Sequence, residues 1–483
     1  MSSLPRRIAY NVVISSAAKI AGTILALVGI GFITRYLGKE GFGDYSTVLA
    51  FFTFFSALAD LGLYAISTRE ISRPGSDELE ILGNVFTMRL ILSAAVVLLA
   101  PILVLAFPYS AAVKFGIMIA AAAYVFSSGY SVLIGLFQKR LAMDKVAIGE
   151  LVGRIFQVVI IILVVRKNIG FLAIIGTLFV NMLVSFLVIF TWSRKYLSFS
   201  LRFNWKTWKK FLAQSYPVGI SAIITFAYFK LDTILLSIMK TNAEVGIYNA
   251  AYKVLENISF FPAMLVGLVM PIMSLYIFHD RNKFLQVADK TFKVFLILTV
   301  PLVIGVLFLA KNIINLIGGA GFSEAVIVLK ILSFAIAFIF FGNFFTNVII
   351  AGNLQKKMMK VLFFCAVFNV SLNLVLIPRF SYLGAAATSS LTEFLVVALT
   401  GWLCWRKLKY IPSFRKSPAI LASGAAMAMF LYLFSAFNFF ILAISSGLVY
   451  FTLLWVFRVI TTGELLSLIS KKGEEVREYE PVI

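Results

Sequence analysis

Residues 170–192 read GFLAIIGTLFVNMLVSFLVIFTW, a stretch of 23 residues without a charged side chain. Basic pairs flank it at 166–167 and at 194–195, so charge is confined to its two ends. About 20 mainly apolar residues in a helix are enough to cross the hydrocarbon core of a bilayer. This stretch alone therefore predicts a transmembrane helix.

The rest of the chain has the same character. Of its 483 residues, 61% are hydrophobic and 13% are charged, and its mean hydropathy is +0.98. A soluble domain is about half apolar and about a quarter charged. We therefore expect an all-α polytopic membrane protein with about 14 transmembrane helices. The predicted spans are residues 10–33, 44–66, 84–107, 113–137, 146–165, 170–192, 214–238, 245–277, 291–313, 324–351, 360–377, 383–404, 418–437 and 439–457.

Basic residues are distributed unevenly between the two sides of these spans. Loops on the side of the N-terminus hold 27 Lys and Arg residues, whereas loops on the opposite side hold 8. Cytoplasmic loops of membrane proteins carry such an excess of positive charge. The bias predicts a protein of the cytoplasmic membrane with both termini in the cytoplasm. It also accounts for most of the net charge of +22, so no nucleic-acid partner is expected.

The sequence contains no motif for catalysis, cofactor binding or metal binding. Cys365 and Cys404 lie within apolar runs, and His279 is the only histidine, so no ligand cluster can be assembled. A phosphate-binding Gly-x-x-x-x-Gly-Lys-Ser/Thr loop is missing, which excludes ATP hydrolysis by the chain itself. No loop between the predicted spans is long enough for a catalytic domain. We therefore expect no catalytic residue, no cofactor and no metal.

Two halves of the chain share short motifs in the same order. Gly43-Asp44-Tyr45 follows the first span, and Gly246-Ile247-Tyr248 follows the seventh. Similar matches link the fourth span with the tenth and the sixth with the twelfth. We expect two six-helix lobes related by a pseudo-two-fold axis along the membrane normal, because an even number of spans in each half gives parallel repeats.

The two predicted lobes leave three further segments of the chain. One of them contains the stretch WKTWKKFL at 205–212, which predicts an interfacial helix with its aromatic side chains toward the acyl chains. The predicted domains are an N-terminal six-helix lobe at 1–193, an interfacial amphipathic linker at 194–213, a C-terminal six-helix lobe at 214–405, two additional helices at 406–460 and a cytoplasmic tail at 461–483.

Three segments of the chain resemble a known family. They are LGKEGFGDY at 37–45, the segment from Leu231 and Asp232 to GIYNAAYK at 246–253, and NLVLIP at 373–378 followed by LGAAAT at 383–388. With these segments the chain resembles the polysaccharide flippases of the multidrug/oligosaccharidyl-lipid/polysaccharide exporter superfamily.

The resemblance implies two six-helix lobes around a central cavity that opens alternately to the two membrane faces. It also implies a cargo, an oligosaccharide linked to a polyprenyl phosphate or pyrophosphate. A flippase moves this cargo from the cytoplasmic to the outer face, for polysaccharide export or protein glycosylation. Glycosyltransferases or polymerases would then be candidate partners, together with the lipid bilayer.

Ionisable side chains inside the spans are the candidate substrate-binding residues, because they are costly in lipid and usually face a cavity or a partner. Lys19 lies on a polar stripe of the first span with Asn11 and Ser15. It could bind a phosphate of the cargo, or it could extend to the lipid headgroups. Arg89, near the start of the third span, could be a headgroup anchor or a cation of the cavity.

The turn near Asn242 places four charged residues of the seventh and eighth spans at similar depths. Lys230 and Glu256 lie twelve and fourteen residues from it, so they can pair across the hairpin. Asp232 and Lys253 lie ten and eleven residues from it and can do the same. The two pairs could be fixed structural ion pairs or a switchable substrate-binding network.

Other residues inside the spans carry separate hypotheses. Glu393, in the middle of the twelfth span, has no partner nearby in the sequence and is a candidate for proton coupling. Pro262 and Pro271 interrupt the long eighth span, where proline removes a helix hydrogen bond. They could form a hinge or a static kink. Glu150 and Arg154, four residues apart, are expected to form a structural pair.

Together these features favour a non-enzymatic flippase for an anionic lipid-linked oligosaccharide. The first alternative is a cation-coupled multidrug antiporter of the same superfamily. By resemblance, such exporters usually have twelve spans and an acidic residue in the first helix, where this chain offers Lys19. The second alternative is a membrane glycosyltransferase or polymerase. It would need carboxylates on an outer loop, and the predicted outer loops are short.

Overall fold

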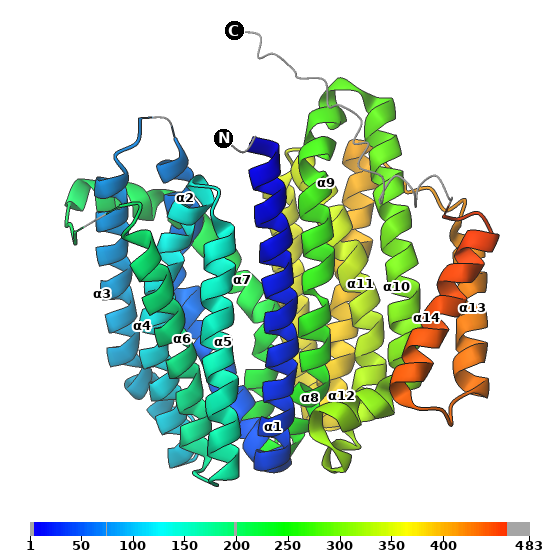
Figure 1. The fold of residues 1–483 in the computed structure, drawn as a ribbon, viewed down its shortest axis with the longest axis horizontal. Helices are drawn as coiled ribbons and strands as arrows, with labels where there is room; N and C mark the ends of the chain where they lie inside the picture. Colours follow the sequence, from blue (N-terminus) through cyan, green and yellow to red (C-terminus); the bar gives the residue numbers. More distant parts are fainter. Residues whose placement is uncertain (1–3, 74, 198–199, 461–483) are drawn as a thin grey trace. The chain divides into compact units, whose positions relative to one another are not determined.

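The computed structural model describes residues 4–73, 75–197 and 200–460, and every regular element in this part of the chain is helical (Figure 1). The elements are α1 (Leu4–Asp60), α2 (Leu63–Ser72), α3 (Glu78–Leu105), α4 (Ala111–Lys139), α5 (Met143–Arg166), α6 (Phe171–Ser193), α7 (Trp205–Met239), α8 (Asn242–Ile258), α9 (Phe260–His279), α10 (Arg281–Gly318), the short 3-10 helix η1 (Ala320–Phe322), α11 (Ala325–Ala351), α12 (Gln355–Leu408), α13 (Ser417–Leu433) and α14 (Phe439–Val456). The predicted all-α class is confirmed. The predicted tail at 461–483 lies outside the described residues.

The helices have the length and composition of membrane spans. Nine of those described are long and apolar enough to cross a membrane, and two bent pairs raise this number to eleven. α1 and α12 are each divided by one residue with a positive φ, Gly38 at 66° and Ser381 at 51°. If the two halves of α1 and of α12 are counted as separate spans, the number rises from eleven to thirteen. The shorter apolar helix α13 would then be the fourteenth span. The multi-pass class is confirmed, and the count of fourteen stays a prediction.

Contacts divide the chain into two compact units, which we describe separately. Unit 1 comprises Met1–Asn257, Ile314–Val328 and Met359–Thr392. Unit 2 comprises Ile258–Ile313, Leu329–Met358 and Glu393–Ile483. This division does not test the symmetric lobes at 1–193 and 214–405, which stay a prediction.

In unit 1, α3, α4, α5 and α6 lie side by side (Figure 1). Small residues allow membrane helices to approach closely. Gly153 of α5 faces α6 in this way, since an added Cβ would lie 2.1 Å from Ser185 Oγ and 2.7 Å from the backbone oxygen of Asn181. A larger side chain at this position would force the two helices apart.

The predicted amphipathic linker is continuous with α7. Asn204 caps the helix, and its side chain accepts two backbone amides of the first turn. Trp205 is 63% exposed, whereas Trp208 is buried in a core cluster with side chains of α2 and α3. The indole of Trp208 donates to Asn84 Oδ1 at 3.1 Å. The aromatic side chains therefore do not share one lipid-facing surface, contrary to the expectation from the amphipathic pattern.

The chain also bends within α9. The bend amounts to 49° and falls at the break between Gly267 and Ile272. Pro262 is buried and precedes the break, whereas Pro271 lies inside it and has a side chain outside the described part of the structure. A bend beside one of the two prolines fits both a hinge and a static kink, so the hinge hypothesis stays a prediction.

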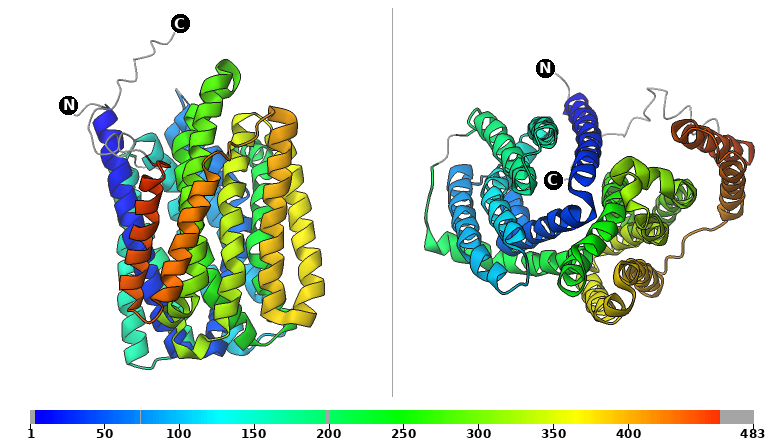
Figure 2. Two further views of the ribbon diagram at one scale, coloured as in Figure 1. Left: turned by 90° about the vertical axis from the view of Figure 1, so that its right-hand side faces the viewer. Right: turned by 90° about the horizontal axis from the view of Figure 1, so that it is seen from below.

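In unit 2, α13 and α14 form a hairpin (Figure 2). Their facing side chains share a core cluster with α10, in which Met427, Leu442 and Leu454 are buried. The hydroxyl of Tyr450 donates to the backbone oxygen of Ile297 at 3.0 Å, which ties α14 to α10. The hairpin thus has its own hydrophobic contacts within this unit.

Candidate functional site

A hairpin of α7 and α8 carries four of the predicted site residues. α7 bends by 49° about three turns before its end, and α8 follows after a two-residue turn. The four residues are Lys230 and Asp232 on α7 and Lys253 and Glu256 on α8.

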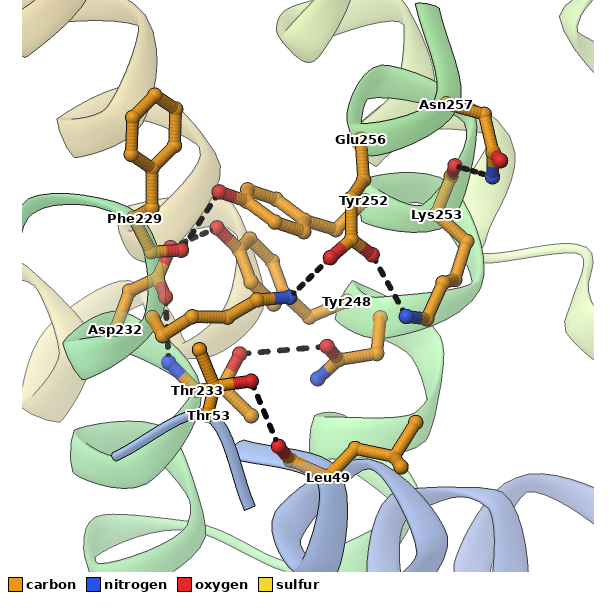
Figure 3. Close-up of polar contacts among 12 residues, drawn as sticks. Leu49, Thr53, Phe229, Asp232, Thr233, Tyr248, Tyr252, Lys253, Glu256 and Asn257 are labelled. Atoms are coloured by element: carbon orange, nitrogen blue, oxygen red, sulfur yellow. Dashed lines mark hydrogen bonds and ion pairs between the residues drawn. The ribbon is translucent and has the colours of Figure 1, made fainter. Parts of the chain in front are cut away.

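Glu256 binds two lysines at once (Figure 3). Lys230 Nζ lies 2.9 Å from one of its carboxylate oxygens, and Lys253 Nζ lies 2.6 Å from the other. The ammonium of Lys230 also lies 5.0 Å from the ring centre of Tyr252, within the range of a cation–π contact. The predicted pair of Lys230 and Glu256 is confirmed, and the same carboxylate holds a second cation.

Asp232 belongs to a separate, buried polar cluster within unit 1. Its carboxylate accepts the backbone amide of Thr233 at 2.6 Å and the hydroxyl of Ser389 at 3.3 Å. It also accepts the hydroxyl of Tyr248. Tyr248 and Ser389 were not identified from the sequence as its partners. Tyr248 lies 16 residues away on α8, and Ser389 lies 157 residues further along the chain.

The predicted pairing of Asp232 with Lys253 was therefore wrong. The depths along the hairpin were estimated correctly, but depth does not fix direction. Two residues along a helix turn the side chain by about 200° around its axis. Asp232 consequently leaves α7 on the opposite side from Lys230, away from Glu256.

A cavity of about 290 Å³ lies beside the two lysines, within unit 1. Helices α1, α5, α6, α7 and α8 supply its walls. Its charged and amide lining consists of Arg154, Gln157, Asn181, Lys230, Lys253, Glu256 and Asn257. Three cations and one acid thus face the same space, which leaves a formal surplus of two positive charges. No three His, Cys, Asp or Glu side chains in the described ranges could hold a metal ion.

Arg154 lines the cavity, a role that was not predicted for it from the sequence. It was expected to pair with Glu150, but its guanidinium donates to Gln157 Oε1 at 2.9 Å. The side-chain amide of Asn181 donates to the same oxygen at 2.8 Å. A signal was available in the sequence, because Arg154, Gln157 and the cavity-lining Ile161 recur at the spacing of one helix face.

Arg89 forms an ion pair of its own. It is 3% exposed, and its Nη1 lies 2.7 Å from Asp60 Oδ1. Its Nε donates to Ser128 Oγ at 3.2 Å. Burial contradicts the headgroup-anchor hypothesis, and Arg89 does not line the cavity described above. The pair joins α1 to α3, and a role in substrate binding stays a prediction.

Two other predicted residues lie apart from the cavity lining. Lys19 is exposed on α1. Glu393 is 7% exposed and begins the last segment of unit 2. The substrate-binding role of Lys19 and the coupling role of Glu393 stay predictions.

A second charged cluster surrounds the break in α1 at Gly38. The guanidinium of Arg35 donates to two backbone oxygens at the C-terminal end of α10, at 3.1 and 2.7 Å. Lys39 Nζ lies 2.6 Å from Glu324 Oε1, and this hydrogen bond lowers the pKa of Glu324 below its ordinary value. These contacts fix the end of α10 and the following turn to α1.

Apolar helices long enough to span a membrane line a basic cavity, an arrangement typical of membrane transport proteins rather than of enzymes. Residues 8–277 match the family described as "Polysaccharide biosynthesis protein", and the chain belongs to this family. The "Capsular polysaccharide biosynthesis protein CapF" of Staphylococcus aureus is 24% identical over 288 residues, which are 58% of this chain and 72% of CapF. The "Probable low-salt glycan biosynthesis flippase Agl15" of Haloferax volcanii is 23% identical over 385 residues, 78% of this chain and 79% of Agl15.

A solved structure described as "Lipid II flippase MurJ, inward closed conformation" has the same fold. The TM-score is 0.74 at 17% sequence identity, and the match covers 95% of this chain and 100% of the MurJ chain. At this identity the likeness concerns the fold alone. The resemblance to the polysaccharide flippases of the exporter superfamily is confirmed by the family match and by this fold.

Proposed function

We propose that the protein is a flippase. Its cargo would be an oligosaccharide linked to a polyprenyl phosphate or pyrophosphate, moved from the cytoplasmic to the outer face of the cytoplasmic membrane. The observation that carries the proposal is the surplus of positive charge in the cavity lined by Arg154, Lys230 and Lys253. Cations within a membrane protein are costly and mark the paths of charged substrates. The names of CapF and Agl15 support a polysaccharide or glycan as cargo.

Glu256 would act as the counter-ion of the empty cavity. Its two oxygens pair with Lys230 and Lys253, so both lysines have an acidic partner before cargo arrives. A phosphate group offers the same lysines more charge and more acceptor oxygens than a carboxylate does, so it competes for them. Binding then exchanges one anion for another at the two lysines.

The amide side chains of the cavity suit the sugar next to the phosphate. Gln157, Asn181 and Asn257 line the same space as the cations, and side-chain amides both donate to and accept from hydroxyl groups. The volume of about 290 Å³ is near the lower end for a ligand pocket. We therefore expect the phosphate and the first sugar to enter the cavity, while the polyprenyl chain stays in lipid.

The orientation in the membrane is part of the proposal. The 27 basic residues of the loops on the N-terminal side, against 8 on the other, favour cytoplasmic termini. Alternating access would present the cavity first to the cytoplasmic face and then to the outer face. Glycosyltransferases that make the cargo and polymerases that use it would be the functional partners.

The two alternatives fit the cavity less well. A multidrug antiporter for organic cations would face like-charge repulsion from the lining, and this repulsion is strong where water is scarce. Enzymes that cleave glycosidic bonds commonly use two carboxylates around the reacting bond, and an enzyme acting on lipid-linked sugars would be expected to offer acidic residues in the same way. The cavity lining has one, Glu256, and that carboxylate is bound by two lysines.

The proposal is tested by the sidedness of lipid-linked oligosaccharide in cells depleted of the protein. A membrane-impermeant labelling or sugar-cleaving reagent separates the outer pool from the cytoplasmic pool. Intact lipid-linked oligosaccharide should accumulate on the cytoplasmic face. Oligosaccharide that reaches the outer face but stays unpolymerised or untransferred would favour an enzyme, and two unchanged pools would favour the antiporter.

A further inference from the structure

An apolar hollow of about 330 Å³ lies at the C-terminal end of α12, within unit 2. Its lining consists of Phe345, Gly401, Trp402, Trp405, Tyr410, Ile411 and Pro412. Trp402, Trp405 and Ile411 are 46%, 55% and 63% exposed, so the hollow opens outward. Exposed tryptophans at the end of a membrane-spanning helix are typical of the interface between lipid and water.

The loop that borders the hollow is fastened to α10. Tyr410 is fully buried, and its hydroxyl donates to Asp289 Oδ1 at 3.0 Å. The backbone amide of Ser413 donates to the same oxygen at 3.1 Å. The guanidinium of Arg281 donates to the backbone oxygen of Lys409 at 2.9 Å. The hollow is therefore a built feature of the fold, shaped by α11, α12 and a fixed loop.

A basic side chain lies beside this hollow, within a segment rich in basic residues. Arg406 lies over Trp402, 5.2 Å from the centre of its ring. The segment 401–416 contains no acidic residue, and its basic residues are Arg406, Lys407, Lys409, Arg415 and Lys416. The acidic residues of the adjoining segment have partners, because Asp289 holds the loop and Asp280 pairs with Lys283 at 3.4 Å.

We propose that the hollow binds an anionic phospholipid of the surrounding bilayer. The headgroup phosphate would lie beside Arg406, and the acyl chains would cover Trp402 and Trp405. A basic side chain beside an apolar lining complements both parts of such a lipid, and basic pockets between membrane helices bind acidic headgroups in general. The site lies in a different unit from the cavity at Lys230, so it does not depend on the proposed transport function.

Native mass spectrometry of the delipidated full-length chain tests the site. Phosphatidylglycerol or phosphatidylcholine with the same acyl chains is added back to the delipidated protein. We expect one phosphatidylglycerol to stay bound in preference to phosphatidylcholine. Arg406→Gln should weaken this retention by about fivefold, the effect of one basic residue near an anionic surface. Gly401→Leu should abolish it by filling the hollow. A Cβ at Gly401 would lie 3.5 Å from the Phe345 ring, an ordinary contact, so the backbone need not move.

Arg194 supplies the matched control. It also lies over an aromatic ring, 5.5 Å from the centre of Phe190, just beyond the end of α6. Arg194→Gln should leave the retention unchanged. Equal retention of phosphatidylcholine, or equal losses from Arg194→Gln and Arg406→Gln, would overturn the proposal, as would full retention by Gly401→Leu. If Gly401→Leu does not fold, Trp405→Ala takes its place, because it truncates an exposed side chain of the lining and should lose the lipid in the same way.

Discussion

Gly43 and Gly246 bring α1 and α8 into backbone contact. A Cβ on Gly43 would lie 1.8 Å from the backbone oxygen of Asn242, and a Cβ on Gly246 would lie 2.0 Å from a backbone oxygen of α1. The two glycines are the first residues of the matching motifs at 43–45 and 246–248. Motifs that match in the sequence thus meet in space, and glycine is required at both because no side chain fits.

Gly246→Ala should lower the free energy of unfolding by about 1–3 kcal/mol, the usual effect of overpacking. The added methyl group meets backbone, which cannot rotate aside as the end of a side chain can. Thermal unfolding in detergent measures the change. Gly176→Ala is the control, because a Cβ there meets no atom within 4 Å. Equal stabilities of the two variants would show that α1 and α8 do not touch at Gly246.

Glu256→Gln should destabilise the empty protein and make it more responsive to anions. The substitution removes the acidic partner of Lys230 and Lys253, and an unsatisfied buried polar group costs about 1–3 kcal/mol. A polyprenyl phosphate should then raise the melting temperature of the variant more than that of the wild type, because it no longer competes with a carboxylate. Thermal shift assays with and without this lipid measure both effects. Equal shifts in the two proteins would argue against Glu256 as the counter-ion.

Arg89→Gln should weaken the fold, and the translocation rate of the protein that does fold tests the predicted substrate-binding role of Arg89. Removing one partner of a buried ion pair costs about 3–5 kcal/mol, and the 25% exposure of the Asp60 side chain favours the lower end of this range. Unfolding curves give the loss of stability, and transport normalised to folded protein gives the rate. A stable variant that does not transport would instead assign Arg89 to the substrate path.

The ion pair of Lys39 and Glu324 should contribute a small stability that depends on pH. The pKa of Glu324 is lower in the folded protein than in the unfolded chain, because Lys39 donates to its carboxylate. The contribution is therefore present above the unfolded pKa and is lost as the pH falls through the lowered folded pKa. For an exposed pair it amounts to about 0–1 kcal/mol.

The corresponding measurement compares the wild type with Glu324→Gln. Their difference in unfolding free energy should be measurable at about pH 7 and should shrink as the pH falls through the lowered pKa of Glu324. A difference that grows toward low pH would contradict the hydrogen bond from Lys39.

The membrane class could be predicted from the sequence because it depends on composition along the chain. The predicted span 170–192 falls on α6 (Phe171–Ser193) to within one residue at each end, and the other apolar stretches likewise fall largely on described helices. The pair of Lys230 and Glu256 was predictable for a related reason, since depth in two adjacent helices can be counted from the turn that joins them. Such counting needs no knowledge of distant contacts.

The remaining features of the site depend on directions and contacts that counting does not give. Asp232 shares the depth of Lys253 but points to the other side of α7, where Ser389 from a distant part of the chain meets it. Arg154 reaches the cavity because α5 packs against α1 and α6, and helix packing cannot be counted from a turn. The pair of Arg89 and Asp60 joins two helices in the same way.

A translocation assay in proteoliposomes is the most direct way to tell whether Lys230 and Lys253 bind the cargo or form only a structural ion pair with Glu256. A labelled polyprenyl-pyrophosphate oligosaccharide is followed from one leaflet to the other with an impermeant reagent. The double variant Lys230→Gln and Lys253→Gln should lose roughly 10- to 100-fold in rate, since a hydrogen bond to a charged group contributes about 1.5–3 kcal/mol. Lys167→Gln, an exposed position at the end of α5, should keep the wild-type rate. A folded double variant that translocates as fast as the wild type would contradict the proposed role of the cationic cavity.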